Sequence, residues 1–241
     1  ALLGVDLGHG AAFEVAVHFW TLLSVALVFR SDIWRLTKAG LLVVRHPRQL
    51  ETLMAKNPDV RFGVNIVIGC VPAGIVGLAF KDELENAFDN PLLVCCALIL
   101  TGVVLLATRF FPAGDRSVGV LDAILIGCAQ ALAIIPGISR SGSTIATAMF
   151  RGIEAEEAAR YSFLLSLPVI AGATLLKVRD FLHAPPPAEL LNALGLGAVV
   201  AFVAGVLALV LLLAVVRRGG FAHFGWYCLA VGLGGVTFGQ F

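Results

Sequence analysis

Charge is scarce in this sequence. Asp, Glu, Lys and Arg make up 14% of the 241 residues, whereas soluble globular domains contain about 25%. The formal net charge is only +1, which argues against the concentrated basic face that a nucleic-acid-binding protein needs. We therefore expect no nucleic-acid partner, and we expect the chain to reside in a membrane.

Cysteine is also sparse, and its pattern argues against two kinds of site. The five cysteines are Cys70, Cys95, Cys96, Cys128 and Cys228. Their number is odd, and all of them lie in apolar runs without the spacing of a zinc site or a disulfide framework. We interpret them as small residues that face lipid or the protein core.

Long apolar runs are abundant, since 59% of the residues are hydrophobic. A membrane-spanning helix needs about 17 or more apolar residues. Runs of about that length lie at 13–29, 62–80, 91–108, 161–176, 190–216 and 221–241, and a seventh, 118–135, leads into a polar stretch. The sequence predicts an all-α polytopic membrane protein with about six transmembrane helices.

The loop charges predict how these spans are oriented. Lys and Arg concentrate in cytoplasmic loops, and the loop 30–61 carries seven of them. Arg109 follows the third span, and Arg217 and Arg218 lie between the last two, so Arg109 and the start of the 161–176 span should share the cytoplasmic side. The segment between them must enter and leave by one face. We predict a re-entrant helix hairpin over 118–150, whose tip near 136–141 lines a cavity.

Residues 136–144 read PGISRSGST and form that tip. Pro136 disfavours helix at the residue before it, Gly137 permits a turn, and Ser141 or Ser143 can cap a new helix that runs toward residue 150. The result is a helix N-terminus at membrane depth, where free N–H groups and the helix dipole favour an anion.

Arg140 is the first candidate ligand of such an anion. An arginine at bilayer depth costs about 2.5 to 3.5 kcal/mol, and each charge-assisted hydrogen bond to an anion returns roughly 1.5 to 3 kcal/mol. Gly142 lets a ligand approach the backbone closely. The alternative is that Arg140 pairs with an internal acid such as Glu14 and only fastens helices together.

Other polar side chains in the apolar runs leave two interpretations open. The hydroxyl groups of the tip are those of Ser139, Ser141, Ser143 and Thr144. Each either contacts the ligand or caps and cross-links helices. Gln130 either reaches the cavity or bonds across helices. Glu14, His18 and Thr21 share one face of the first span and either line the same cavity or are hydrated and packed.

The stretch QALAIIPGISRSGST at 130–144, followed by YSFLLSLPVIAGA at 161–173, resembles the second signature of the bacterial undecaprenyl-diphosphate phosphatases, the bacitracin-resistance family. FEVAVHFWTLLSV at 13–25 is similar to that family's first spanning helix, and the resemblance covers essentially the whole chain. It implies an inverted repeat, here 1–117 and 118–241, with one re-entrant hairpin and three spans in each half.

The resemblance implies a hydrolase that converts undecaprenyl diphosphate to undecaprenyl phosphate and inorganic phosphate in the bacterial inner membrane. That reaction recycles the lipid carrier for cell-wall synthesis and confers bacitracin resistance. The implied catalytic residues are Arg140, Ser139, Ser141 and Thr144, and the implied substrate-binding residues are Gly137, Gly142, Ser143 and Gln130. The resemblance also implies a divalent cation, Mg²⁺ or Ca²⁺, and apolar walls for the polyprenyl tail. The expected partners are this lipid, membrane lipids and, as an open alternative, a second copy of the chain.

One departure from the family concerns the N-terminus. The family carries an earlier signature, rich in glutamate and ending in serine, threonine, glycine and histidine, upstream of the helix that corresponds to 13–29. This sequence opens at Ala1, after that signature. We expect an N-terminal truncation with little or no turnover, or else a degenerate member that binds without hydrolysis.

Two other classes of function compete with the phosphatase. A transporter or flippase of an anionic substrate is the first, because inverted repeats and broken helices that aim their N-termini at anions are also transporter architecture. A structural membrane scaffold is the second, but it leaves Arg140 and the glycines of the tip without a role.

Overall fold

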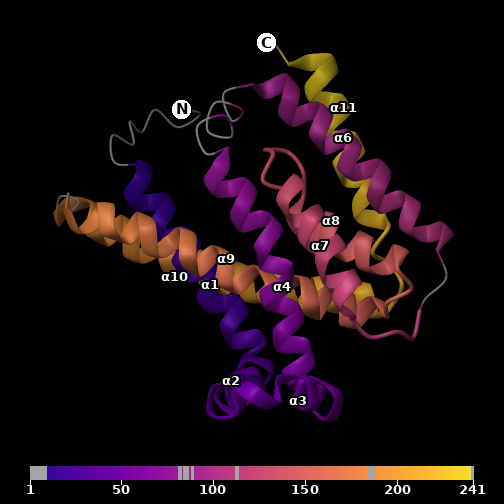
Figure 1. Cartoon of the computed structure of the whole chain (residues 1–241). Helices are drawn as coiled ribbons and strands as arrows, with labels where there is room; N and C mark the ends of the chain where they lie inside the picture. Colours follow the sequence, from indigo (N-terminus) through magenta and orange to yellow (C-terminus); the bar gives the residue numbers. More distant parts are fainter. Residues whose placement is uncertain are drawn as a thin grey trace. The chain divides into compact units, whose positions relative to one another are not determined.

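The computed structural model is all-α (Figure 1). It describes residues 10–80, 83, 87, 90–111, 114–183 and 188–239, without the side chains of 10–18, 173, 176–183 and 188–194. The helices are α1 (Gly10–Val28), α2 (Arg30–Arg45), η1 (Pro47–Gln49), α3 (Leu50–Lys56), α4 (Pro58–Ala79), α6 (Pro91–Ala107), η2 (Thr108–Phe110), α7 (Val120–Leu132), α8 (Arg140–Phe150), α9 (Ala155–His183), α10 (Ala188–Arg217) and α11 (His223–Phe238). The described residues form no strand beyond an isolated bridge between Arg116 and Ile153. The predicted all-α class is confirmed.

The helix lengths agree with a polytopic membrane protein, because each predicted span coincides with one helix. In the described part of the chain, three helical stretches are long and apolar enough to cross a bilayer: Pro58–Ala79, Pro91–Phe110 and Gly195–Arg217. The first has 22 residues and is about 33 Å long, against a hydrocarbon core of about 30 Å. In contrast, α7 and α8 have 13 and 11 residues, or about 20 and 17 Å, and are too short to cross.

Two of the long helices begin at the same local signal, an Asn-Pro pair. The side chain of Asn57 accepts hydrogen bonds from the backbone N–H groups of Asp59 and Val60, at 3.0 and 3.4 Å. Asn90 accepts one from Leu93, at 3.1 Å. In both helices proline occupies the first turn, where its missing N–H costs nothing and its fixed φ suits the helix.

The chain forms two compact units. Unit 1 contains α1, the later part of α9 from Leu167 and α10 as far as Leu211. Within it, the ring of Trp20 meets the ring of Phe202 edge-on, with centroids 6.1 Å apart, so that α1 packs on α10. The Ser24 hydroxyl donates to the backbone oxygen of Thr21 at 2.6 Å, which satisfies it inside α1. Glu14 and His18, predicted to share a face with Thr21, lie outside the described side chains.

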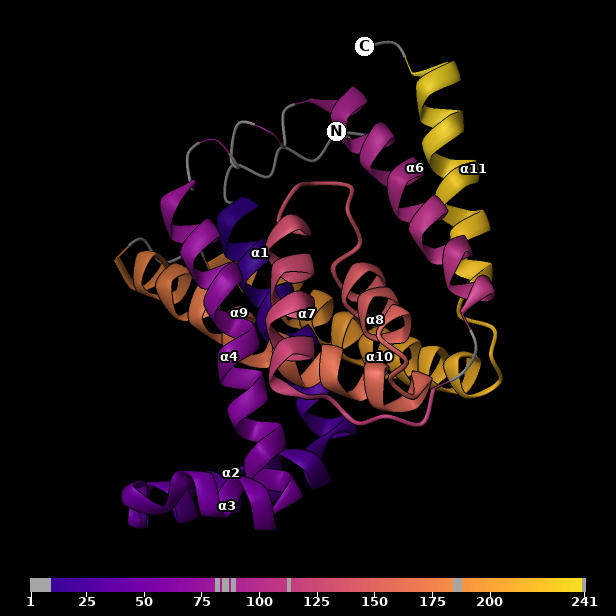
Figure 2. The same cartoon turned by 45° about the vertical axis from the view of Figure 1, so that its right-hand side comes forward.

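Unit 2 contains the helices from α2 to α8, the start of α9, the end of α10 and α11. In it α4 packs along α7, and α6 packs along α11 (Figures 1 and 2). The α4–α7 crossing is close, since a β-carbon added at Gly127 would meet the carbonyl oxygen of Gly69. Small residues permit such backbone approach between membrane helices. The predicted division into repeats 1–117 and 118–241 concerns internal symmetry and stays a prediction.

Candidate functional site at the tip of the α7–α8 hairpin

Helices α7 and α8 pack against each other and form a hairpin whose two ends meet at its base. The backbone N–H of Arg116, before α7, donates to the carbonyl oxygen of Gly152, after α8, at 3.3 Å. The N–H of Glu154 donates to the carbonyl oxygen of Arg116, also at 3.3 Å. The chain therefore enters and leaves the hairpin at one place, as the predicted re-entrant topology requires.

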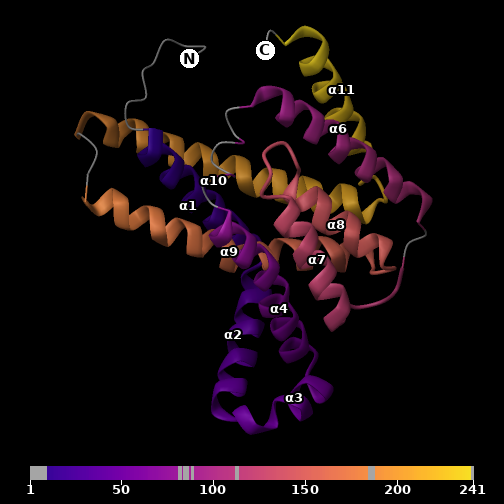
Figure 3. The ribbon, with the colours of Figure 1, turned by 45° about the horizontal axis from the view of Figure 1, so that its top comes forward.

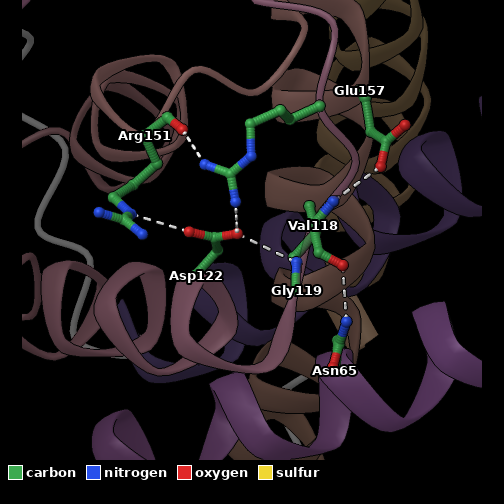
Figure 4. A network of polar contacts seen from close by, with 7 residues as sticks. Asn65, Val118, Gly119, Asp122, Arg151 and Glu157 are labelled. Atoms are coloured by element: carbon green, nitrogen blue, oxygen red, sulfur yellow. Dashed lines mark hydrogen bonds and ion pairs between the residues drawn. The ribbon is translucent and has the colours of Figure 1, made fainter.

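A buried carboxylate holds this base together (Figure 4). Only 2% of the Asp122 side chain is exposed, and its Oδ1 accepts a hydrogen bond from Arg151 Nε at 2.8 Å. Its Oδ2 accepts from the Gly119 N–H at 3.1 Å and lies 3.4 Å from Arg116 Nη2. The carboxylate thus caps the N-terminus of α7 and is neutralised by arginines from both ends of the hairpin. Asp122 was not predicted from the sequence, although an acid within an apolar run was a signal for it.

The base is also attached to α4 and α9. Val118 donates its N–H to Glu157 Oε1 of α9 at 3.0 Å and accepts a hydrogen bond from Asn65 Nδ2 of α4 at 2.8 Å (Figure 4). The Tyr161 hydroxyl donates to the carbonyl oxygen of Asn65 at 2.6 Å. Since α4 is one of the helices long enough to span, these bonds fix the hairpin against a membrane helix.

The tip is held by α6. Gly137 has a φ of +91°, and a β-carbon there would meet the carbonyl oxygen of Val94 and lie 2.9 Å from Ala97 Cβ. The hydroxyl of Thr101 donates to the carbonyl oxygen of Gly137 at 3.4 Å and accepts from the Ser139 N–H at 3.1 Å. The tip backbone is thereby fixed in one conformation by a neighbouring helix.

The cap of α8 differs from the prediction. Ser139 is the N-cap, and its hydroxyl oxygen accepts a hydrogen bond from the Gly142 N–H at 3.1 Å. The prediction that Ser141 or Ser143 caps this helix is therefore wrong, because the helix begins at Arg140, directly after the turn. Capping by Ser139 leaves its own hydroxyl proton available to a further acceptor.

The free donors of the site belong to the first residues of α8. The backbone N–H groups of Arg140 and Ser141 have no acceptor among the described residues. Nor does the Arg140 guanidinium form a hydrogen bond or ion pair within the described part of the chain. The half-buried hydroxyls of Ser141 and Ser143 are likewise without a described partner. Two N–H groups, a guanidinium and hydroxyls at a helix N-terminus are a donor set for an anion.

Two of the predicted site residues are deeply buried. Thr144 is 0% exposed, and its hydroxyl lies 2.8 Å from the Arg140 carbonyl oxygen and 2.6 Å from the Ser162 hydroxyl. These partners use its hydrogen-bonding capacity inside the protein. Gln130 is 2% exposed, and its amide oxygen and nitrogen both lack a partner among the described residues. A buried amide is normally satisfied, so Gln130 has bonding capacity for a water or a ligand.

An apolar cavity of about 710 Å³ lies between α4, the start of α6 and α7. Its walls include Pro72, Ile75, Val76, Phe80, Leu132 and Ile135. Ile135 directly precedes the proline of the tip, whereas none of residues 136–144 lines the cavity. The hairpin therefore carries a polar donor set at its tip and, on α7, part of the wall of an apolar cavity.

Comparison with known proteins assigns the chain to a family. The family described as "Bacitracin resistance protein BacA" matches residues 1–234. The chain belongs to this BacA family. Its relatives include a protein named "Undecaprenyl-diphosphatase" from Salinibacter ruber, 40% identical over 96% of this chain and 86% of the relative. Another of that name, from Korarchaeum cryptofilum, is 37% identical over 92% of this chain and 83% of the relative. "Undecaprenyl-diphosphatase 1" from Bacillus licheniformis is 34% identical over 98% and 86%.

The tip of this BacA-family chain does not by itself suit a divalent cation. Magnesium and calcium prefer carboxylate and carbonyl oxygens, whereas the tip offers hydroxyls, N–H groups and a guanidinium. In the part of the chain that the structure describes, no three His, Cys, Asp or Glu residues form a group that could hold a metal. The divalent cation stays a prediction, and no step below depends on it.

Proposed function

We propose that the protein hydrolyses undecaprenyl diphosphate to undecaprenyl phosphate and inorganic phosphate, and so is a polyprenyl-diphosphate phosphatase. Membership of the BacA family supports the activity, since the relatives named above are undecaprenyl-diphosphatases. One structural observation carries the assignment of the site: the Arg140 guanidinium and two N–H groups are unpartnered among the described residues at a helix N-terminus. The diphosphate is the anion that these donors bind.

The proposed role of the tip is to hold the phosphates and stabilise charge during transfer. Phosphoryl transfer concentrates negative charge on the oxygens of the transferring group, and preorganised donors stabilise it. Arg140 supplies a forked cation, while the N–H groups of Arg140 and Ser141 supply oriented dipoles. The hydroxyls of Ser139, Ser141 and Ser143 add contacts, and Gly142 keeps the backbone accessible. Thr144 is buried and supports the site indirectly, because its hydrogen bond to Ser162 of α9 holds α8 in place.

The proposal also covers the binding of the polyprenyl tail and the location of the protein in the cell. The apolar cavity beside Ile135 accepts the first isoprene units of the polyprenyl tail. Gln130 contacts the substrate directly or through a water that its orphan amide holds. The protein acts in the bacterial inner membrane, with the loop 30–61 on the cytoplasmic side, where it recycles the lipid carrier. A second copy of the chain as a partner remains a prediction.

Phosphate release by the full-length protein from undecaprenyl diphosphate in detergent micelles tests the proposal. Arg140→Ala should lower kcat by roughly 100- to 1000-fold, the effect of removing one transition-state donor in other enzymes. Arg109→Ala is the matched control, because Arg109 is an exposed arginine in η2, directly after α6, with no described partner. Equal rates for the Arg140 and Arg109 variants would remove the role assigned to the tip.

The transporter alternative gives the opposite result in sealed vesicles. A flippase moves the lipid-linked diphosphate between leaflets without releasing phosphate, whereas the phosphatase releases phosphate without net movement of the lipid. The names of the relatives favour the phosphatase. Movement without release would overturn the proposed function and leave the anion site in place.

A further inference from the structure

Helices α2 and α3, joined by η1, form an arm at the N-terminal end of α4. Figure 2 shows the arm lying crosswise to α4, and Figure 3 shows α2 and α3 meeting at the end that lies away from α4. Because α4 is one of the helices long enough to cross the bilayer, a segment crosswise to its end lies along a membrane surface. The hydrolysis proposed above makes no use of this arm.

One face of α2 attaches the arm to the rest of unit 2. Ala39 is buried, and Leu36 Cδ2 lies 3.5 Å from the position of a β-carbon at Gly63 of α4. Asp32 Oδ1 forms an ion pair with Arg160 Nη2 of α9 at 2.7 Å. The Arg160 guanidinium lies 4.8 Å from the ring centre of Phe62. The arm is therefore held in a defined orientation.

The outward face of α2 is apolar and basic. Trp34, Leu41 and Val44 are 62%, 54% and 77% exposed, and they follow one another at spacings of seven and three, which places them on one helical face. Lys38 and Arg45 lie on the same face, and Lys38 Nζ sits 5.0 Å from the ring centre of Trp34. In water such a face would leave large apolar side chains hydrated.

The charge of the segment indicates what covers this face. Residues 30–61 carry seven basic and three acidic side chains, a net charge of +4. A helix with Trp and aliphatic residues beside Lys and Arg is typical of one that lies in the headgroup layer, and tryptophan is enriched at that depth. Anionic lipids give the cytoplasmic leaflet a negative surface potential that attracts basic segments. A soluble protein partner would explain the apolar residues, but not their position at the end of a spanning helix.

We propose that the α2–α3 arm is an interfacial anchor that binds anionic phospholipids of the cytoplasmic leaflet. Trp34, Leu41 and Val44 lie among the upper acyl chains. Lys38 and Arg45 bond the phosphates of neighbouring headgroups. The arm thereby sets the depth of the α4 N-terminus and gathers negatively charged lipid beside the protein.

The test uses Trp34 as a reporter in the full-length protein. With Trp20, Trp226 and any tryptophan outside these 241 residues replaced by Phe, the remaining fluorescence comes from Trp34. The protein is reconstituted into phosphatidylcholine vesicles with phosphatidylglycerol, and either lipid is supplied brominated on its acyl chains. We expect quenching of Trp34 by both lipids, stronger for brominated phosphatidylglycerol at equal content.

Charge variants distinguish binding of anionic headgroups from mere insertion of the apolar side chains into the bilayer. Lys38→Gln with Arg45→Gln should lower the ratio of phosphatidylglycerol to phosphatidylcholine quenching, by up to about five-fold for each charge removed. Arg109→Gln with Arg218→Gln is the matched control, since it removes two exposed charges outside the arm. Circular dichroism verifies that each variant retains its helices.

Each contrary result overturns part of the proposal. Absence of quenching by either lipid, together with ready quenching by aqueous iodide, would place the outward face in solvent and refute the anchor. A quenching ratio near one that does not respond to Lys38→Gln with Arg45→Gln would refute selection of anionic lipid. An equal fall of the ratio in the control variant would assign the effect to net charge and not to this face.

Discussion

Gly137 is the residue on which the shape of the tip depends most directly. Its positive φ is costly for any residue with a side chain, at about 1 to 3 kcal/mol, and a β-carbon would also meet the Val94 carbonyl oxygen. We expect Gly137→Ala to lower the free energy of unfolding by about 2 to 5 kcal/mol, since overpacking adds to the backbone strain. Urea or thermal unfolding in detergent micelles measures the change.

Gly219 provides the control for that substitution. It has a φ of +71°, and no atom lies within 4 Å of the β-carbon position. Gly219→Ala should therefore show the backbone cost alone, about 1 to 3 kcal/mol. If the two variants lose the same stability, contact with α6 does not fix the tip.

At the residue scale, the sequence singles out Arg140, because a charge among apolar residues has few structural explanations. Its role as an anion ligand stays a prediction, whereas the hydrogen bonds of the tip are visible only in the structure. The N-cap at Ser139 could not be predicted from the sequence, because Ser141, two residues later, is an equally suitable capping residue. Which of the two caps α8 depends on where the preceding turn ends. The burial of Thr144 depends on Ser162, which lies on another helix.

The hairpin base is the element that determines where the tip lies. Asp122→Asn should destabilise it by about 1 to 3 kcal/mol, because two arginines lose a buried carboxylate, although their exposed fractions of 54% and 37% permit partial hydration. Hydrogen exchange in α7 and α8 should accelerate, and phosphate release should slow. If Asp122→Glu restores both the slow hydrogen exchange and the rate of phosphate release, the carboxylate is what holds the hairpin in position.

An exposed acid in the same loop is the control for Asp122. Asp115 is exposed and has no described partner, so Asp115→Asn should change stability by less than about 0.5 kcal/mol. Faster exchange in α7 and α8 in both variants would mean that the loss of a negative charge, and not the Asp122 contacts, loosens the hairpin.

At the element scale, helix positions followed from apolar runs, and the hairpin followed from loop charges. Their ends did not follow as well: α4 begins at Pro58 because Asn57 caps it, four residues before the predicted run. The clamp of Asp122, Arg116 and Arg151 joins residues up to 35 positions apart. No periodicity of the sequence encodes which side chains meet after the hairpin closes.

At the scale of the whole molecule, composition determines the class of the fold and packing determines the arrangement. In lipid every backbone polar group needs an internal partner, so a chain this apolar is expected to be helical. Which helices pack against each other is decided by close approach of their backbones at sites such as Gly69 of α4 and Gly127 of α7. Many other glycines lie in the same helices, so the sequence alone cannot say which pair meets.

The orientation of the molecule gives the last prediction. Ser117 and Glu154 are exposed residues at the two ends of the hairpin, and the backbone bonds of Arg116 bring these ends together. In a variant without the five native cysteines, Ser117→Cys and Glu154→Cys should both react with an impermeant maleimide from the cytoplasmic side, as should Arg48→Cys in the α2–α3 arm. Glu83→Cys, four residues after the end of α4 at Ala79, should react from the opposite side, because α4 is long enough to cross the bilayer and the arm lies at its other end. Labelling of positions 117 and 154 from opposite faces would mean that the segment crosses the bilayer, which the lengths of α7 and α8 forbid unless the hairpin opens.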